Sequence, residues 1–193
     1  MELNFIQEKQ QLRQNVSLLL KAFSSEEKAL KSEFIHAQIL SWEKLNRFET
    51  IGLYAATPLE VGTFSLFQTL HQRNKKIAFP RVNQTTQTLD FYWVDDWNHL
   101  ERGEWKVLEP SPTSSQCAGL EKIDLLLVPG VAFDRVGGRL GRGKGFYDRV
   151  LKEFRGESLG VAFEAQLFDS IPQDQHDQPV RGLVTEKQRT HFY

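Results

Sequence analysis

Residues 137–145 are crowded with glycine and cationic side chains, and this segment constrains the chain more than any other. It follows an apolar run at 123–129 and precedes a stretch with helical periodicity at 146–155. Glycines let backbone N–H groups approach an anion, and cations just before a helix N-terminus add positive charge there. The glycines are Gly137, Gly138, Gly141, Gly143 and Gly145, and the cations are Arg139, Arg142 and Lys144. The pattern predicts a polyphosphate ligand.

The spacing of this loop differs from that of the two best-known phosphate-binding motifs. Gly138, Gly143 and Lys144 match the start of a P-loop. Gly145, however, stands where that motif needs the Ser or Thr that holds magnesium. The dinucleotide fingerprint fails too, because its last glycine interval is wrong and no acidic residue follows at the required distance. Asp148 is then the nearest candidate magnesium ligand, and the alternative is that it only complements the helix dipole.

Composition limits the classes of protein that fit. A chain of 193 residues is long enough for one α/β domain and too short for two ordinary ones, so we expect a single domain over 1–193. The net charge of −1 argues against a nucleic-acid-binding protein, which makes the cations of the loop a local feature. Cys117 is the only cysteine, which excludes an internal disulfide and fits a reducing cytoplasm. We expect no export signal and no membrane partner.

The order of apolar and polar stretches predicts an α/β fold. Two helices are expected at 3–23 and 26–46, with Ser24 and Glu27 as a capping box between them. Further helices are expected at 63–73 and 146–155. The strand candidates are 51–56, 76–80, 89–94, 123–129, 158–163 and 182–185. This alternation predicts a three-layer αβα arrangement with a mostly parallel, Rossmann-like sheet, and ligands beyond the carboxyl ends of its strands.

Two smaller segments allow more than one interpretation. Residues 110–119 read as a loop that is too short to link two domains. In the first helix Lys9 falls on an apolar stripe and Arg13 borders it one turn later. Their stems could pack while their charged ends reach water or an internal carboxylate. Alternatively, their four-residue spacing could project both toward a single anion.

Residues 124–134 and 138–148 together resemble the signature of the 5-formyltetrahydrofolate cyclo-ligase family, also called 5,10-methenyltetrahydrofolate synthetase. The likeness extends along nearly the whole chain. Supporting positions are Lys9 and Arg13, residues 60–63, Phe79 and Pro80, Glu109 and Pro110, residues 160–164, Ile171 and Pro172, and His176 and Asp177. Gly62, Leu89 and Arg181 depart from residues that are common in the family.

The resemblance implies an enzyme of folate one-carbon metabolism. Such an enzyme converts 5-formyltetrahydrofolate to 5,10-methenyltetrahydrofolate in a reaction that depends on ATP and Mg²⁺ and releases ADP and phosphate. The formyl oxygen is phosphorylated and N10 then attacks the activated carbon. The implied partners are a reduced folate and ATP, and nothing in the sequence requires more than a monomer.

The resemblance also implies roles for single residues. Lys144, Arg139 and Arg142 would stabilise the transferring phosphoryl group, and Lys9 and Arg13 would hold the other phosphates. The remaining nucleotide contacts would be Gly141, Gly143, Gly145, Phe146 and Tyr147. The folate contacts would be Glu60, Ala55 and Trp105 together with Arg142, Phe146 and Tyr147. Asp148 and Asp177 would hold Mg²⁺, which prefers oxygen ligands.

Three other functions remain open at this point. A relative that binds folate or nucleotide without catalysis would keep the loop but not turn over ATP. An enzyme of similar architecture could act on a sugar phosphate or a CoA thioester, because fold does not fix function. RNA binding through the cationic loop would be strongly salt-dependent.

Overall fold

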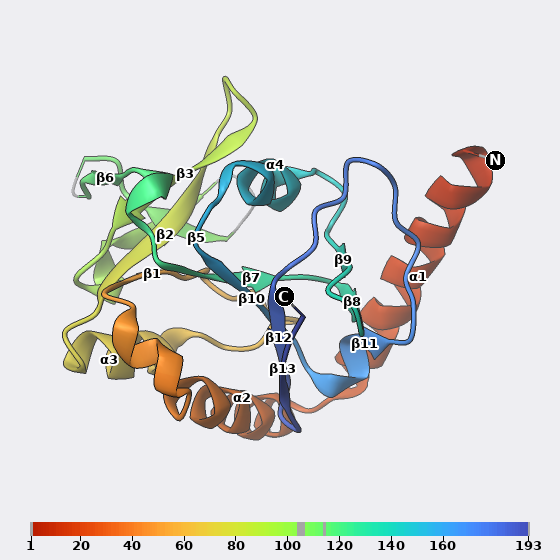
Figure 1. Cartoon of the computed structure of the whole chain (residues 1–193), viewed down its shortest axis with the longest axis horizontal. Coiled ribbons are helices and arrows are strands. Elements are labelled where there is room, and N and C mark those ends of the chain that lie inside the picture. The colour runs from red at the N-terminus through yellow and green to blue at the C-terminus, as the bar shows by residue number, and fades with distance from the viewer. Residues whose placement is uncertain (1, 104–106, 114, 193) are drawn as a thin grey trace.

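The computed structural model of the protein describes residues 2–103, 107–113 and 115–192. Its centre is an eight-stranded sheet (Figure 1). From one edge to the other the strands are β13 (Arg189–His191), β12 (Gly182–Val184), β10 (Glu157–Val161), β7 (Leu125–Pro129), β1 (Thr50–Gly52), β2 (Lys76–Asn83), β3 (Thr88–Trp93) and β6 (Cys117–Ala118). The run from β12 to β2 is parallel, whereas β13, β3 and β6 are antiparallel to their neighbours. The expected mostly parallel sheet is confirmed.

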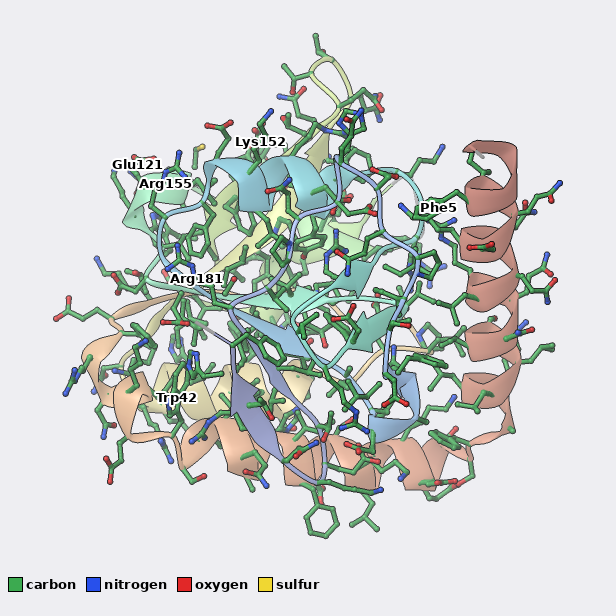
Figure 2. All side chains as sticks on the ribbon, turned by 45° about the vertical axis from the view of Figure 1, so that its right-hand side comes forward. Phe5, Trp42, Glu121, Lys152, Arg155 and Arg181 are labelled. Atoms are coloured by element: carbon green, nitrogen blue, oxygen red, sulfur yellow. The ribbon has the colours of Figure 1, made fainter. Side chains whose placement is uncertain are left out.

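Helices cover both faces of this sheet, which confirms the expected αβα arrangement (Figure 1). The helices are α1 (Glu2–Ala22), α2 (Ser25–Leu40), α3 (Phe64–Gln72) and α4 (Phe146–Glu153). Figure 1 shows α2 and α3 on one face and α4 on the other, with α1 upright at one side. Figure 2 shows Phe5 on the side of α1 that faces the rest of the molecule. In the part of the chain that is described, no helix is both long and apolar enough to cross a bilayer.

Short elements complete the fold. A three-stranded sheet contains β11 (Leu167–Phe168), β8 (Ala132–Asp134) and β9 (Arg139–Leu140), and a hairpin contains β4 (Leu100–Arg102) and β5 (Leu108–Pro110). The 3-10 helices are η1 (Glu43–Arg47), η2 (Trp97–His99), η3 (Leu120–Lys122) and η4 (Glu164–Gln166). These pieces are too short to have a periodic sequence pattern.

The apolar run that became β7 is continuous because both of its faces are buried. Leu125 and Leu127 pack into the core under α2 and α3, whereas Leu126 and Val128 pack into the core under α4. All four side chains are fully buried. Strands covered on both faces lose the alternation of apolar and polar residues that marks a half-exposed strand.

The structure corrects several expected boundaries. The strand expected at 51–56 ends at Gly52, and the strand expected at 76–80 continues to Asn83. The helix expected at 26–46 ends at Leu40, because Trp42 adopts an extended backbone and is buried. A 3-10 helix follows it instead. The expected loop at 110–119 includes β6, which pairs with β3, and its first residue ends β5. The Ser24 cap is confirmed, since its Oγ accepts a hydrogen bond from the Glu27 N–H at 3.0 Å.

The chain leaves the adjacent parallel strands β1 and β7 toward opposite edges of the sheet. From β1 the chain passes through α3 to β2 on one side, whereas β7 is followed by β10 and β12 on the other side. Connections that leave two adjacent strands in opposite directions open a crevice beyond their carboxyl ends. Residues of the glycine-rich loop and of the segment after β1 line the same cavity there.

Asp124 ties the beginnings of these two central strands together. Its Oδ2 accepts hydrogen bonds from the backbone N–H groups of Glu49 and Thr50 at 2.8 and 2.9 Å and from Thr50 Oγ1 at 2.7 Å. Burial raises the pKa of this carboxyl, but the bonds from Thr50 and Glu49 outweigh it and the net pKa is lowered. The ionised carboxylate is thus the form that stabilises the β1–β7 junction.

We predict that Asp124→Ala lowers the free energy of unfolding by about 1–2 kcal/mol at pH 7, since exposed hydrogen bonds to a charged group contribute modestly. A lowered carboxyl pKa contributes stability above the unfolded-state pKa of about 3.9, and that contribution is lost as pH falls through the folded-state value. The gap between wild type and variant should therefore shrink below about pH 4. Urea denaturation at several pH values measures it. Asp169→Ala, at a side chain 93% exposed, is the control that should change little.

Candidate active site

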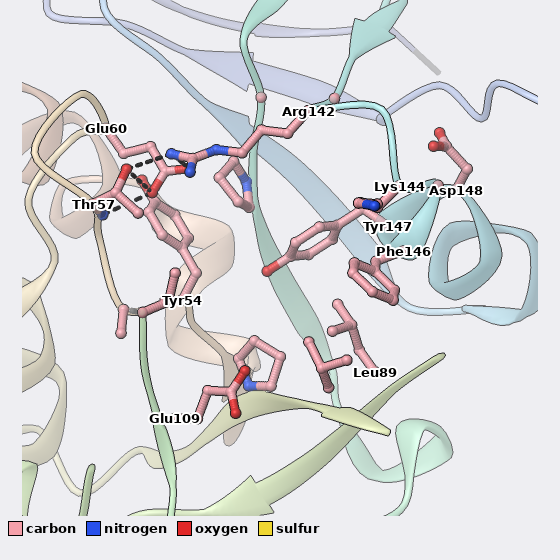
Figure 3. Close-up of a pocket in the computed structure, with 18 of the residues that line it drawn as sticks. Tyr54, Thr57, Glu60, Leu89, Glu109, Arg142, Lys144, Phe146, Tyr147 and Asp148 are labelled. Atoms are coloured by element: carbon pink, nitrogen blue, oxygen red, sulfur yellow. Dashed lines mark hydrogen bonds and ion pairs between the residues drawn. The ribbon is translucent and has the colours of Figure 1, made fainter. Parts of the chain in front are cut away.

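A pocket of about 390 Å³ opens beyond the carboxyl ends of β1 and β7 (Figure 3). Its walls come from the segment after β1, the β2–β3 hairpin, the region of β5, and the glycine-rich loop with the start of α4. The predicted ligand-contact residues that line it are Ala55, Glu60, Arg139, Gly141, Arg142, Lys144, Gly145, Phe146, Tyr147 and Asp148. Lys9, Arg13, Gly143 and Asp177 lie outside its lining, and Trp105 lies outside the described residues.

The glycine-rich loop needs glycine for its backbone course. Gly143 and Gly145 have φ angles of 97° and 67°, a region that side chains disfavour. Gly145 is the N-cap of α4, so the loop turns directly into the helix. The loop is held from outside by Arg13, whose Nε donates to the Gly141 carbonyl at 2.8 Å, and by Arg149, which donates to the Lys144 carbonyl at 2.9 Å.

Arg139 is a buried cation at the wall of the pocket. Its side chain is 2% exposed, and its Nη2 donates to Asp148 Oδ1 at 2.7 Å. Its Nε is buried and has no hydrogen-bond partner among the described residues. A Cβ on Gly141 would lie 2.8 Å from Arg139 Nη1, so the glycine makes room for the guanidinium. A buried N–H of a cation that has no hydrogen-bond acceptor in the protein can donate to a bound anion.

Glu60 and Arg142 meet at the opposite corner of the pocket (Figure 3). Glu60 Oε2 accepts from the Thr57 N–H at 2.8 Å and from Thr57 Oγ1 at 2.9 Å, and its Oε1 accepts from Arg142 Nη2 at 3.0 Å. Arg142 also donates to Thr57 Oγ1. Figure 3 shows this cluster facing Lys144 and Asp148 across the ring of Tyr147. We call the corner with Glu60, where Arg142 pairs with that carboxylate, the carboxylate corner, and the corner with Arg139 and Lys144, where Asp148 pairs with Arg139, the cationic corner.

Tyr147 and an apolar wall separate the two corners. Burial, followed by the nearby charge of Glu60, raises the pKa of Tyr147, so its phenol is neutral at physiological pH. Val82 and Leu89 of the β2–β3 hairpin line the apolar side. Phe91, in the aromatic stretch 91–93, is buried in the core, and none of these three residues lines the pocket.

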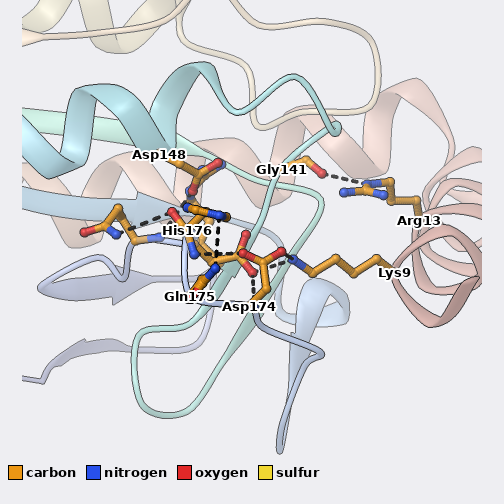
Figure 4. A network of polar contacts seen from close by, with 10 residues as sticks. Lys9, Arg13, Gly141, Asp148, Asp174, Gln175 and His176 are labelled. Atoms are coloured by element: carbon orange, nitrogen blue, oxygen red, sulfur yellow. Dashed lines mark hydrogen bonds and ion pairs between the residues drawn. The ribbon is translucent and has the colours of Figure 1, made fainter. Parts of the chain in front are cut away.

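Lys9 is paired with carboxylates (Figure 4). Its Nζ donates to Asp174 Oδ2 at 2.7 Å and to Asp177 Oδ2 at 2.5 Å. Burial lowers the pKa of Lys9, but the hydrogen bonds to Asp174 and Asp177 outweigh it, and the net pKa is raised. The side chain is therefore an ammonium group, and of the interpretations of its place on the apolar stripe the structure shows the internal carboxylate. A phosphate-binding role for Lys9 stays a prediction.

The two predicted metal ligands lie in one neighbourhood. The backbone N–H of Gln178, next to Asp177 in the chain, donates to Asp148 Oδ1 at 3.3 Å. The hydrogen bonds described for these carboxylates use Asp148 Oδ1 and Asp177 Oδ2. Within the described ranges no group of three or more His, Cys, Asp or Glu side chains could hold a metal ion. Two carboxylates fit Mg²⁺ when phosphate oxygens and water complete its shell.

Several contributors to this site leave little or no signal in the sequence. Thr57, which holds Glu60 and Arg142, follows a strand as a polar residue, and that position was the available signal. Asp174 stood beside Asp177 in the sequence but gave no sign of its bond to Lys9. Gln166 is buried and donates to the carbonyls of Gly130 and Val131, which shapes the turn after β7. No local pattern announces such a bond over 36 residues.

Comparison with known proteins agrees with this architecture. The profile of the 5-formyltetrahydrofolate cyclo-ligase family matches residues 5–186. The 5-formyltetrahydrofolate cyclo-ligase of Mus musculus is 26% identical over 189 residues, which cover 92% of this chain and 93% of that protein. The protein of the same name from Mycolicibacterium smegmatis is 31% identical over 143 residues, which cover 72% and 74%. The NMR structure of Aquifex aeolicus 5,10-methenyltetrahydrofolate synthetase shares 34% identity and a TM-score of 0.85, over 95% of this chain and 92% of that one.

The matched segment begins within α1 and ends beyond β12, so it includes the pocket and every element that builds it. Since the match extends over nearly the whole chain, the protein belongs to the 5-formyltetrahydrofolate cyclo-ligase family and is an enzyme of that family.

Proposed function

We propose that this enzyme converts 5-formyltetrahydrofolate to 5,10-methenyltetrahydrofolate, with ATP consumed and ADP and phosphate released. The observation that carries the proposal is the division of one pocket into two corners. Glu60 can accept N–H groups of a reduced pterin at one corner, while Arg139 and Lys144 offer cations to a phosphoryl group at the other. Family membership supports the same reaction.

The chemistry requires a formyl oxygen to become a leaving group. In the proposed route that oxygen attacks the γ-phosphorus of ATP and ADP departs. N10 then attacks the formyl carbon and gives up its proton to solvent, and the C–O bond breaks as phosphate leaves. No nucleophilic side chain is needed, so the protein contributes positioning and charge stabilisation. Tyr147, a neutral phenol with its ring between the corners, would hold the formyl group and the γ-phosphate next to each other.

The cations of the site are positioned before the ligands arrive. Arg139 is fixed by Asp148, and Arg142 is fixed by Glu60 and Thr57. Fixed charges stabilise a developing charge without the cost of reorganisation. Asp148 and Asp177 would hold Mg²⁺, which when bound neutralises part of the charge on phosphate oxygens. Arg13 contacts the glycine-rich loop at Gly141, and Lys9 contacts the 174–177 segment. From these places the two cations would reach the other phosphates.

The direct test is near-ultraviolet absorbance after mixing the protein with 5-formyltetrahydrofolate and Mg-ATP. Appearance of the methenyl chromophore only when ATP is present is the expected result. An unchanged spectrum beside an active positive control would reject the proposal for this substrate. Binding of folate without turnover would point instead to a catalytically silent relative.

Lys144→Ala should lower kcat on the order of 10²–10³-fold, because loss of one preorganised charge at a transition state has an effect of this size. The KM for 5-formyltetrahydrofolate should change little. Steady-state kinetics at saturating substrates measure both values. Lys152→Ala is the matched control, since Lys152 is an exposed lysine on α4 (Figure 2) and should keep full turnover. Full turnover of the Lys144 variant would disprove the role.

Asp177→Asn should raise the Mg²⁺ concentration for half-maximal activity by about tenfold, which corresponds to about 1.4 kcal/mol of binding free energy. Chelation of the metal should stop turnover of the wild type, and added Mg²⁺ should restore it. A titration of activity against Mg²⁺ measures the shift. A melting curve of the variant separates this effect from loss of the Lys9 ion pair. An unchanged Mg²⁺ requirement would exclude Asp177 as a ligand.

A further inference from the structure

The segment that carries Glu60 is attached to α2 on both sides of that residue. Lys28 Nζ donates to the Pro58 carbonyl at 3.2 Å. Four residues further along the helix, Ser32 Oγ accepts from the Gly62 N–H at 3.1 Å. Four residues further again, His36 Nε2 bonds to the Gly62 carbonyl at 2.7 Å. Side chains at this spacing lie on one face of a helix.

Two of these three side chains are polar groups in a buried position. Ser32 is 5% exposed and His36 is 7% exposed, on a helix face that otherwise enters the core through Ile35 and Ile39. A buried polar side chain costs free energy unless its hydrogen bonds are made. The two backbone polar groups of Gly62 are both hydrogen-bonded to this pair: the N–H to Ser32 and the carbonyl to His36.

The bonds of His36 define its protonation. Its Nε2 faces a carbonyl oxygen and must carry the proton, so its Nδ1 accepts from the Ser65 hydroxyl at 3.2 Å. Burial lowers the pKa of His36, which agrees with a neutral ring. The ring therefore bridges Gly62 and Ser65 at the start of α3. It holds both the backbone of the Glu60 segment and the point where that segment enters α3.

Inside the segment the geometry of Glu60 depends on the same backbone. The Glu60 N–H donates to the Thr57 carbonyl at 3.0 Å, and the Tyr54 hydroxyl donates to the Val61 carbonyl at 3.1 Å. The attachments at Pro58 and Gly62 lie two residues before and two residues after Glu60. A carboxylate between two fixed points keeps its place while the pocket is empty.

We propose that Ser32 and His36 are positioning residues for the folate: by holding the Gly62 peptide against α2 they set the position of Glu60 in the pocket. The inference rests on the proposed function, because it takes Glu60 as the acceptor for the pterin. It assigns a role in substrate recognition to a helix that does not line the pocket. Arg139, Lys144 and Asp148 lie on elements separate from the Gly62 segment, and Arg139 is held by Asp148, so we expect the nucleotide contacts of these three residues to be independent of this attachment.

The test compares folate and nucleotide parameters in the full-length protein. Ser32→Ala and His36→Leu should each raise the Kd for 5-formyltetrahydrofolate, measured by calorimetry without ATP, by about tenfold, because small displacements of a binding group carry penalties of this order. The KM for 5-formyltetrahydrofolate should rise in parallel, and the KM for ATP should stay within about twofold, since a purely structural defect would move both. Ser25→Ala, the same change at an exposed position of α2, is the matched control.

His36→Gln decides between positioning and folding. Its amide can donate to the Gly62 carbonyl as Nε2 does, so it should restore folate affinity relative to His36→Leu. Melting curves identify any variant that has lost its fold. The inference would be overturned if His36→Gln and His36→Leu raised the Kd for 5-formyltetrahydrofolate equally. It would also be overturned if the KM for ATP rose as much as the KM for 5-formyltetrahydrofolate. Failure of the wild type to bind 5-formyltetrahydrofolate would reject the proposed function itself. A higher Kd for this folate in Glu60→Gln, with an unchanged Kd in Ser32→Ala and His36→Leu, would reject only the positioning role.

Discussion

The junction between β1 and β7 is the constraint on which the rest of the structure depends. The two strands pair side by side, and the chain leaves them toward opposite edges of the sheet. Their carboxyl ends therefore open a crevice that neither connection fills. The Glu60 segment follows one strand, and the turn that leads to the glycine-rich loop follows the other. Asp124 binds the opposite ends of the same pair, so the register that aligns the two halves of the pocket is set at its base.

Three cations in or beside the candidate site are each held by a carboxylate. Arg139 is held by Asp148, Arg142 by Glu60, and Lys9 by two carboxylates. The attraction within each ion pair offsets part of the free energy of desolvating the charges, so several cations can lie close together in a partly buried site. The leftover N–H of Arg139 is consistent with a site whose polar groups are completed by a ligand. Preorganisation and ligand affinity thus rest on the same contacts.

The sequence predicted the fold well where local chemistry decides structure. The Ser24 cap, the positions of the main strands though not all of their ends, and the glycine-rich loop before α4 could be read from short patterns. It failed where a distant contact ends an element, as at Trp42, whose burial terminates α2 early. It also failed for β6, a two-residue strand that exists because β3 offers it a partner. Neither case leaves a signal within a few residues.

Residue types and spacing by themselves determined the glycine-rich loop before a helix, the αβα class and the resemblance to the cyclo-ligase family, because these depend on backbone freedom, hydrophobic periodicity and short motifs. Only the tertiary structure decided which charges meet. The contacts that build the site join positions from 26 to 165 residues apart. They are the ion pairs of Arg142 with Glu60 and of Lys9 with Asp174, and the hydrogen bonds of Ser32 and His36 to Gly62. Such contacts arise from strand order and helix placement, and a linear sequence carries no local trace of either.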